Sequence, residues 1–508
     1  MPRRGWITAV VLAIVAIIIN SISNQKQDTS PRSIIPGRNN TALFISNAEY
    51  GQLNVNLAAA QALLLHHPNV EIHFATFGSR AKDIASINKY ARLKRPTARS
   101  IIFHEVKSAP SYGDMMTAKG YTVESTINPP GYRGCAHLFR EIQRVLYAWS
   151  GPQHIALFEE LSRLIHEVNP SVVMVDTMFG PSMDAVRELD RRYAVLSPNA
   201  LLTNFAEMQP YLSFLWKYPA LGSAHPYPVP WHLIPLNIYI NLRLAYSIYV
   251  NPSMVEMKKY LQTHGITKPV DIFSVYRPHN LTWISQGSLE ADFPLPVIPD
   301  NVKAVGPILL ASASAAEQDP ELASWIQKAP TVMIHLGSHV DYDEKGAREM
   351  ADAIRVLLEQ TDVQVLWKFK MRRVNGTIVY STYFVEEMMG ENRARLWMTR
   401  WLSIDPPAML ETGNIAAAVT HGGASSFYEA MINGVPQVIL PVWLDNYEFA
   451  SRAECKELVA AFLAVLGNSS QAVQLRSAAK EFAKKFEGKP GREKAADIIA
   501  ELAGLGEV

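Results

Sequence analysis

Short apolar runs alternate with longer stretches of helical periodicity along most of this chain. Near its start, Thr41–Ser46 and Val70–Thr76 have the composition of buried strands, and Asn54–His66 places alanine and leucine at helical spacing between them. Strand, helix and strand in this order predict a βαβ unit with parallel strands. The pattern returns in the predicted strands Ser171–Val175 and Tyr193–Leu196 and the predicted helix Met183–Arg191.

The second half of the chain repeats this alternation. Apolar runs predict strands at Thr331–Leu336, Val363–Lys368, Arg395–Thr399, Ile415–Val419 and Gln437–Val442. Helices are predicted at Lys345–Glu359, Ser426–Asn433, Lys456–Leu466, Gln471–Phe486 and Arg492–Leu502. Strands and helices that alternate on this scale are typical of α/β proteins with mostly parallel sheets.

The length of the chain and the position of a proline-rich stretch predict how it divides into domains. Its 508 residues suit two domains of about 200 residues each. Proline and small residues gather at Pro294–Ala311, where we expect the linker. The predicted parts are a polar tether at 25–40, an N-terminal domain at 41–300, a C-terminal domain at 301–470 and closing helices at 471–508 that pack across the domain junction.

Composition excludes some classes of function. Hydrophobic residues make up 48% of the chain and charged residues 19%, and the net charge is +1. No basic surface is therefore expected, and with it no nucleic-acid partner. Cys135 and Cys455 are the two cysteines, and no Cys/His spacing predicts a metal site.

The first residues form a candidate membrane segment. Trp6–Ile19 is apolar except for Thr8, which is short for a span and typical of a signal-peptide core. Residues 1–24 are thus a signal anchor or a signal peptide, and Ser21-Ile22-Ser23 is a weak cleavage step that favours an uncleaved single-pass anchor. A membrane of the endoplasmic reticulum or secretory pathway is the expected location, with orientation left open by basic residues on both flanks.

A segment at about 201–278 departs from the α/β pattern. It is rich in Trp, Tyr, Leu and Pro, and proline interrupts it too often for a transmembrane helix. We expect helices and loops that cover the ligand-binding side of the N-terminal domain. Their aromatic content suits a lipophilic ligand or a bilayer surface, and ordinary core packing is the alternative.

The strongest candidate site follows the predicted strand Ile415–Val419. That strand stops at His421, Gly422 and Gly423, and paired glycines let the backbone turn tightly and approach a ligand. Ser426 and Glu429 have capping-box spacing, which predicts a helix start. Strand, glycine loop and helix N-terminus together favour a phosphate or diphosphate ligand.

The same residues carry a family resemblance. The runs THGGASSFYEA and GVPQVILPVWLDNYEFASRAE, preceded by Trp401, resemble the nucleotide-sugar signature of UDP-dependent family 1 glycosyltransferases, most closely fungal-type members. The resemblance implies two facing Rossmann-like domains, the B-type glycosyltransferase fold, over about Thr41 to Leu502. It implies that donor-binding residues are Ser338, Trp401, His421, Gly422, Gly423, Ser425, Ser426, Glu429, Asp445 and Asn446.

In the resembling enzymes each of these residues has a distinct role. The matching histidine, glycine-serine step and helix N-terminus hold the diphosphate, the glutamate holds the ribose, and the acidic-plus-amide pair holds the sugar, while the tryptophan stacks on uracil. Simpler interpretations stay open for individual residues. Glu429 could serve only the capping box, Asp445-Asn446 and Ser338 only turns, Trp401 only the core, and His421 only the loop surface.

Catalysis in the resembling family implies a second pair of residues. A histidine after a glycine in the first loop removes the acceptor proton, and an aspartate orients it; these positions correspond to Gln52 and Asp176. Gln52 is a departure, because an amide does not accept a proton at neutral pH. Glu49 and Tyr50 are nearby titratable groups. Asp176 alternatively serves only as a strand-end or helix-start residue.

Two more departures concern the donor side and the end of the chain. Ile404 replaces the glutamine that the family has three residues after the tryptophan, and Leu402–Met409 is about two residues longer than in that pattern. Lys456–Leu466 runs directly into a helical pattern where the family has a further loop and strand. A deletion of roughly fifteen to twenty residues is our interpretation.

The expected function follows from the resemblance. It is an inverting transfer of a hexose, with glucose expected, from a UDP-sugar to a hydroxyl of a small lipophilic acceptor. The UDP-sugar is a co-substrate, and neither cofactor nor metal is expected. One alternative is an impaired homologue that binds a nucleotide sugar or lipid without efficient turnover, and another is a nucleotide-sugar epimerase on the same architecture.

Overall fold

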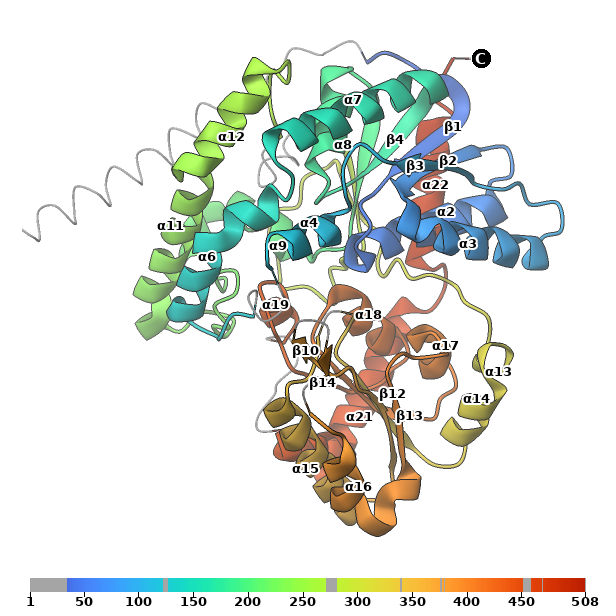
Figure 1. Ribbon diagram of the computed structural model, residues 1–508, viewed down its shortest axis with the longest axis vertical. Coiled ribbons are helices and arrows are strands. Elements are labelled where there is room, and N and C mark those ends of the chain that lie inside the picture. Colours follow the sequence, from blue (N-terminus) through green and yellow to red (C-terminus); the bar gives the residue numbers. More distant parts are fainter. Residues whose placement is uncertain are drawn as a thin grey trace, which may run out of the picture. The chain divides into compact units, whose positions relative to one another are not determined.

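The computed structural model describes residues 34–121, 127–270, 281–338, 340–374, 377–378, 380–450, 458–467 and 469–507. The chain forms two compact units (Figure 1). Among the described residues, the first unit comprises 34–121, Asn128–Leu310 and the residues from Gly491 onward, and the second comprises Ile127 and Ala311–Pro490. The predicted membrane segment at 1–24 lies outside the described residues. Among the helices that are described, none has both the length and the hydropathy needed to cross a bilayer.

The first unit is built on a parallel sheet. Its strands are β1 (Arg38–Ile45), β2 (Glu71–Phe77), β3 (Ile102–Val106), β4 (Pro170–Asp176), β5 (Tyr193–Ser197), β6 (Thr282–Ser285) and β7 (Val302–Ala304). They stand in the order β3-β2-β1-β4-β5-β6-β7, with every pairing parallel. The order reverses between β1 and β4, so the loops after these two strands flank the point where ligands bind in open α/β sheets.

Helices cover both faces of this sheet. The helices of this unit are α2 (Tyr50–His66), α3 (Ala81–Lys94), α4 (Tyr112–Ala118), α6 (Tyr132–Leu146), α7 (Gly151–Val168), α8 (Gly180–Glu188), α9 (Leu201–Phe205), α10 (Ser213–Trp216), α11 (Ile234–Tyr249), α12 (Pro252–Thr263) and α22 (Gly491–Ala503). Ala42 and Phe44 of β1 enter one core with α2 and α22, whereas Leu43 and Ile45 enter the other with α7 and α8. Two buried faces explain why β1 has a continuous apolar run rather than an alternating pattern.

Strand β1 begins at Arg38, earlier than the predicted Thr41. The Arg38 amide donates to the Asn169 carbonyl at 2.7 Å, and the Asn39 amide donates to the Glu507 carbonyl at 2.8 Å. These partners come from distant parts of the chain, so the local polar pattern did not reveal them. The last residues of the predicted tether are therefore paired.

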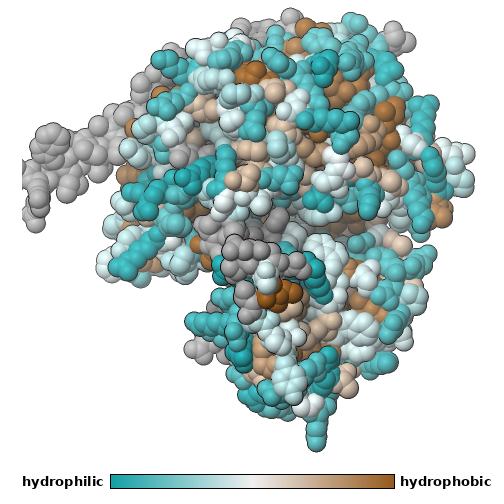
Figure 2. All heavy atoms as spheres, in the orientation of Figure 1, coloured by the Kyte–Doolittle hydropathy of each residue, from teal (hydrophilic) through white to brown (hydrophobic). Residues whose placement is uncertain are grey.

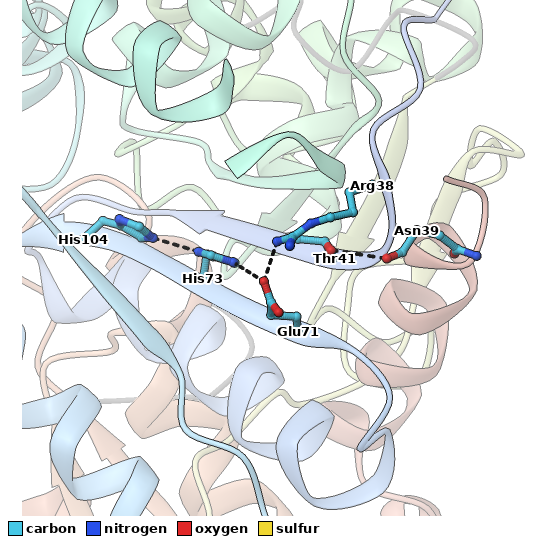
Figure 3. A network of polar contacts seen from close by, with 6 residues as sticks. All are labelled: Arg38, Asn39, Thr41, Glu71, His73 and His104. Atoms are coloured by element: carbon cyan, nitrogen blue, oxygen red, sulfur yellow. Dashed lines mark hydrogen bonds and ion pairs between the residues drawn. The ribbon is translucent and has the colours of Figure 1, made fainter. Parts of the chain in front are cut away.

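A chain of polar contacts joins the first three strands (Figure 3). The Glu71 carboxylate accepts hydrogen bonds from Arg38 and from His73 Nε2, the latter at 2.8 Å. His73 Nδ1 lies 2.8 Å from Nε2 of His104. The hydrogen bond from His73 is the main cause that lowers the pKa of Glu71, and burial lowers the pKa of His104. The chain thus favours a charged Glu71 beside a neutral His104.

The second unit has a smaller parallel sheet. Its strands are β8 (Thr331–His335), β9 (Gln364–Lys368), β12 (Leu396–Thr399), β13 (Ile415–Thr420) and β14 (Gln437–Ile439), in the order β12-β9-β8-β13-β14. A separate hairpin pairs β10 (Arg373–Val374) with β11 (Thr377–Ile378). The order reverses between β8 and β13, which brings the loops after these two strands side by side.

Helices again cover the two faces of the sheet. They are α13 (Ala315–Gln318), α14 (Pro320–Ile326), α15 (Glu344–Gln360), α16 (Tyr383–Met389), α17 (Pro406–Leu410), α18 (Ala424–Ile432), α19 (Asn446–Ala450), α20 (Leu458–Leu466) and α21 (Ser470–Ala483). Ala417 and Val419 of β13 face one core, and Ile415 and Ala418 face the other. Of the two closing helices, α21 belongs to the second unit and α22 to the first, where it packs on α2.

Candidate functional site

Asp176 is the most constrained polar residue at the switch point of the first unit. It ends β4 and is fully buried. Its Oδ2 accepts hydrogen bonds from Ser46 Oγ at 3.1 Å, from the Asn47 amide at 2.9 Å and from Asn47 Nδ2 at 2.6 Å. Its Oδ1 accepts from the Met178 amide at 2.6 Å. The carboxylate therefore fixes the loop after β1.

Burial raises the pKa of Asp176 to about 6, although these hydrogen bonds oppose the shift. Asn47 is the partner that the sequence pattern did not reveal. Its side chain donates to Asp176, while its Oδ1 accepts from the Glu49 amide at 2.6 Å. Its position directly after a buried strand was the available signal, because loops at carboxyl strand ends carry ligand-binding residues.

Gln52 lies in the first turn of α2, at the same edge of the sheet. Its Oε1 accepts a hydrogen bond from Thr177 Oγ1 at 2.8 Å. The two residues that the resemblance assigned to catalysis, Gln52 and Asp176, are thus brought to one edge of the sheet. Their side chains bond to different partners, so Gln52 is anchored on the residue that follows Asp176 rather than on Asp176 itself.

Glu49 directs a carboxylate to the region around Asp176. A Cβ placed on Gly113 of α4 would lie 2.7 Å from Glu49 Oε1, so the absence of a side chain at Gly113 makes room for this carboxylate. The charge of Glu49 raises the pKa of Asp176, after the larger effect of burial. Glu49 is therefore an acidic group at the switch point whose side chain does not cap α2, although it stands at the N-cap position of that helix.

Tyr50, the other titratable neighbour, faces α3. The Arg80 guanidinium carbon lies 4.0 Å from the centroid of its ring, and its hydroxyl lies 3.4 Å from both carboxylate oxygens of Asp83. Burial and the Asp83 charge raise the pKa of Tyr50. Its hydroxyl is thus harder to ionise than that of an exposed tyrosine.

In the second unit, the imidazole of His421 lies between two glycines. A Cβ on Gly337 would lie 2.7 Å from His421 Cε1, and a Cβ on Gly423 would lie 2.5 Å from His421 Nε2. Cβ atoms in proteins do not approach non-bonded atoms this closely, so a side chain at either glycine would displace the imidazole ring. Gly422 has φ +80°, and its Cβ would lie 2.7 Å from Ile439 Cγ2. The glycines of the predicted loop are required by close approach and by backbone conformation.

The helix after this loop starts earlier than predicted. Helix α18 begins at Ala424 with Gly423 as its N-cap in extended backbone (φ −67°, ψ 141°), and no side chain caps it. The predicted capping box of Ser426 and Glu429 was wrong, because the extended glycine lets the helix begin two residues before the serine. Ser425 and Ser426 consequently lie in the first turn, where backbone amides lack intrahelical acceptors and can bind an anion. The predicted end is confirmed, since Gly434 follows at φ +64°.

Glu429 has no role in capping and lies in an environment that disfavours its charge. Burial raises its pKa to about 7, and the charge of Asp405 adds to this effect. Asp405 precedes α17, which packs on α18, and burial also raises the pKa of Asp405. Two carboxyl groups are therefore held near each other where α17 packs on α18.

Asp445 and Asn446 open α19 and approach the glycine loop. The Asn446 amide donates to the Trp443 carbonyl at 2.9 Å in a turn, as the simpler interpretation predicted. The buried Asn446 side chain also donates through Nδ2 to the Gly422 carbonyl at 3.3 Å. Burial raises the pKa of Asp445 to about 6. The pair thus forms a turn, and Asn446 also contacts the glycine loop.

Trp401 is exposed, with 56% of its surface accessible, so the interpretation as a core residue was wrong. Lys368 Nζ lies 3.9 Å from the centroid of its ring. Ile404, where the family has glutamine, is fully buried in the core between the sheet and α17. The departure at this position is therefore a packing residue.

Lys368 is a further residue that the sequence pattern did not reveal. It ends β9, and its ammonium donates to the Gly337 carbonyl at 2.8 Å while only 5% of the residue is exposed. Burial lowers its pKa to about 8, and the neighbouring Lys370 adds to the effect. The available signal was a lysine at the end of a buried apolar strand. Burying an ammonium costs free energy unless the charge has a hydrogen-bonding partner or binds a ligand.

Together these groups form an edge of the second sheet that suits an anion. Lys368, the N-terminus of α18 and the ring of His421 approach the Gly337 turn, and Ser338 follows directly after it. Lys370 lies beside Ser338 and pairs with Asp341 at 2.7 Å. Within the ranges given above, no three His, Cys, Asp or Glu side chains are grouped to hold a metal ion.

Two α/β units with parallel sheets, one of them carrying a glycine loop and a helix N-terminus at its switch point, define a two-domain fold of the B-type glycosyltransferase class. The family profile described as "UDP-glucoronosyl and UDP-glucosyl transferase" matches residues 237–484. Glycosyltransferase sdnJ of Sordaria araneosa is 33% identical over 425 residues, which cover 82% of each chain. The chain therefore belongs to the family of UDP-dependent glycosyltransferases, which are enzymes that transfer a sugar to an acceptor.

Two further comparisons extend this result. The 2-hydroxyacylsphingosine 1-beta-galactosyltransferase of Rattus norvegicus is 27% identical over 223 residues, which are 43% of this chain and 36% of the relative. The structure of a UDP-glucosyltransferase from Polygonum tinctorium superposes with a TM-score of 0.55 at 14% identity, covering 93% of this chain and 99% of that chain. At this identity the likeness concerns the fold.

Proposed function

We propose that this enzyme transfers a hexose, glucose in the first instance, from a UDP-sugar to a hydroxyl of a small lipophilic acceptor with inversion. The single observation that carries the donor side is the imidazole of His421 between Gly337 and Gly423 at the N-terminus of α18. A diphosphate placed there meets backbone amides, a histidine and the ammonium of Lys368.

The remaining donor contacts follow from the positions of the side chains. The exposed indole of Trp401 offers one flat apolar surface to uracil, and Lys368 lies against the ring. Glu429 is proposed for the ribose hydroxyls, and Asp445 with Asn446 for the sugar. Because Lys368 and the amides of α18 supply positive charge to the departing diphosphate, the proposed reaction needs no metal.

A lipophilic acceptor is supported by the aromatic segment at 201–278 and by what relatives are named for. One relative is named for an acylsphingosine acceptor, and the enzyme from Polygonum tinctorium is described as capable of glucosylating indoxyl. Both molecules contain a large apolar part. We extend this shared property, and neither molecule itself, to the present enzyme.

For the acceptor proton we propose Glu49 as the general base. Gln52 cannot accept a proton at neutral pH, and the Asp176 carboxylate already accepts four hydrogen bonds from the fold. Glu49 is a second carboxylate at this edge of the sheet. A second candidate function, nucleotide-sugar or lipid binding without efficient turnover, is favoured by the amide at position 52.

One pair of measurements tests the proposal. Calorimetry measures UDP binding, and a screen with sterols and phenols measures UDP released from UDP-glucose. Binding together with acceptor-dependent release supports the transferase. Binding without release from any UDP-sugar and acceptor pair supports the impaired homologue, and an absence of UDP binding overturns the donor site itself.

We also propose that residues 1–24 remain in the protein as a membrane anchor of the secretory pathway. The support is the apolar run Trp6–Ile19 with its weak cleavage step. The protein is then expected to stay in carbonate-washed membranes and to retain its N-terminal peptide in mass spectrometry. A mature chain that begins after Ser23 would contradict this.

A further inference from the structure

Exposed apolar side chains gather on one segment of the first unit. This segment extends from Met208 to the end of α11. Among the described large hydrophobic residues it contains the two with the largest exposed fractions, Tyr211 at 90% and Trp231 at 82%. We call the following set the aromatic surface: Met208, Tyr211, Leu212, Trp216, Trp231, Tyr239 and Tyr246. Figure 2 shows one face of the molecule, on which hydrophilic residues predominate and hydrophobic residues occur in small groups.

The backbone holds part of this surface outward. Tyr211 and Leu212 have φ of +58° and +52°, a left-handed conformation that side chains other than glycine, asparagine and aspartate rarely adopt. Trp216 Nε1 donates a hydrogen bond to the Tyr211 carbonyl at 3.0 Å, which closes this turn. Two adjacent strained residues that point apolar side chains into solvent gain nothing from the fold itself, and this favours a use outside it.

Asn237 of α11 is a buried polar side chain that makes several hydrogen bonds within this segment. Asn237 Oδ1 accepts from the Ala220 amide at 2.8 Å, and its Nδ2 donates to the carbonyls of Leu215 and Tyr218 at 3.0 Å and 2.9 Å. His225 Nδ1 lies 2.9 Å from the same Oδ1. The backbone from Leu215 to Ala220, which includes Trp216, is thus tied to one side chain, so this part of the aromatic surface is held by a defined structure.

Basic residues are the charged residues in the interior of this segment. From Met208 to Val255 the sequence contains Lys217 and Arg243 and no Asp or Glu, while the exposed Glu207 and Glu256 flank this stretch. Lys217 Nζ lies 5.4 Å from the centroid of the Tyr218 ring, at the foot of the turn that carries Tyr211. A protein surface that joins exposed Trp, Tyr and Leu to two cations, with acidic residues only at its two ends, suits the headgroup region of an anionic bilayer.

We propose that the aromatic surface docks this enzyme on the surface of a phospholipid bilayer that contains anionic lipids. Tyr211, Leu212 and Trp231 enter the boundary between headgroups and acyl chains, and Lys217 and Arg243 stay at the phosphates. A hydrophobic partner protein fits less well, because nothing in the segment supplies acidic groups to pair with a partner's cations. Docking of this kind uses residues of the folded first unit and requires neither donor binding nor the N-terminal segment.

The test uses the full chain bound to vesicles of phosphatidylcholine and phosphatidylserine. An environment-sensitive nitrobenzoxadiazole label is attached to a cysteine in Tyr211→Cys, and in Leu93→Cys as the matched control, since Leu93 of α3 is also largely exposed, at 73%. The parent chain, labelled identically, gives the background of Cys135 and Cys455. Both substituted side chains point to solvent, so neither change removes core packing.

Docking predicts that vesicles raise and blue-shift the emission of the label at position 211, and that nitroxide-labelled lipid quenches it, while the label at position 93 stays in an aqueous environment. Replacing phosphatidylserine by phosphatidylcholine weakens the response. Equal behaviour of the two labels on vesicles overturns the proposal. A shift at position 211 without vesicles overturns it as well, and assigns the surface to self-association if it follows protein concentration, or to the acceptor if it follows added sterol or phenol.

Discussion

Gln52 and Thr177 are joined by a hydrogen bond of 2.8 Å, in which the threonine hydroxyl donates to the side-chain oxygen of the glutamine. The family resemblance assigns the general base to position 52, and this contact holds the Gln52 amide in place. Asp176, the neighbour of Thr177, is at the same time held by Asn47 and Ser46. The acceptor side of the enzyme is therefore organised around a different acid–base group or lacks one, and two variants distinguish these cases.

We expect Glu49→Gln to lower the rate of sugar transfer by about 10²–10⁴-fold, the usual contribution of positioned proton transfer. The affinity for UDP should stay unchanged, because Glu49 lies in the first unit and the donor loop in the second. Steady-state kinetics with a saturating acceptor and calorimetry with UDP provide the two measurements. A variant that keeps its transfer rate would remove Glu49 from the mechanism.

Gln52→His tests the alternative that this protein is a catalytically impaired homologue. If position 52 is a vacated base position, the histidine should raise transfer by a comparable factor without changing UDP affinity. If Glu49 is the base, the histidine only breaks the hydrogen bond with Thr177 and gives no gain. An increase after this change, together with no loss in Glu49→Gln, would establish the impaired homologue.

His421→Ala should weaken UDP binding more than uridine binding. The imidazole lies over the glycines that approach the donor diphosphate, and a hydrogen bond to a charged group contributes about 1.5–3 kcal/mol, or roughly ten- to hundredfold in affinity. Calorimetric titrations with UDP and with uridine give the ratio. Equal losses for both ligands would place the histidine away from the phosphates, and Trp401→Ala, expected to weaken both ligands, is the control for a base contact.

Lys368 should make UDP binding dependent on pH near 8. Burial lowers its pKa to about 8, so the ammonium loses its proton and its charge as the pH rises through this value. Affinity for the anionic diphosphate should therefore fall between about pH 7 and pH 9 in the native chain. In Lys368→Met, which keeps an unbranched apolar stem, affinity is lower and this fall disappears. A persistent fall in the variant would assign the titration to another group.

The polar contacts that join β1, β2 and β3 should make the free energy of unfolding of the first unit decrease as the pH falls. Burial lowers the pKa of His104 in the folded state, so its contribution is lost as the pH falls below the unfolded value of about 6.5. Glu71, whose pKa is also lowered, contributes above its unfolded pKa of about 4.3 and loses this contribution as the pH falls further. His104→Asn should remove the first of these two losses in urea unfolding measured from pH 7.5 to 5. An unchanged pH dependence would show that His104 does not titrate with unfolding.

The alternation of apolar runs determined the class of fold. Strands buried on both faces must be continuous apolar runs, so elements such as Ile415–Val419 and Ser171–Val175 were predicted within a residue or two of β13 and β4. The glycine loop was also predictable, because Gly422 and Gly423 next to a strand and a helix leave few local conformations. The donor residues after this loop lie close together in sequence, which is why a motif could identify them.

Tertiary structure decided what depends on partners far away in the chain. Position 404 is a core position. Lys368 lies at the Gly337 turn because β9 pairs in parallel with β8, which brings the end of β9 to the turn that follows β8. Asp176 holds Asn47 across 129 residues of sequence, and Tyr211 is exposed because a turn closed by Trp216 turns it outward. A local pattern specifies which face of an element is apolar, whereas the neighbour that this face or strand end meets is set by strand order and packing.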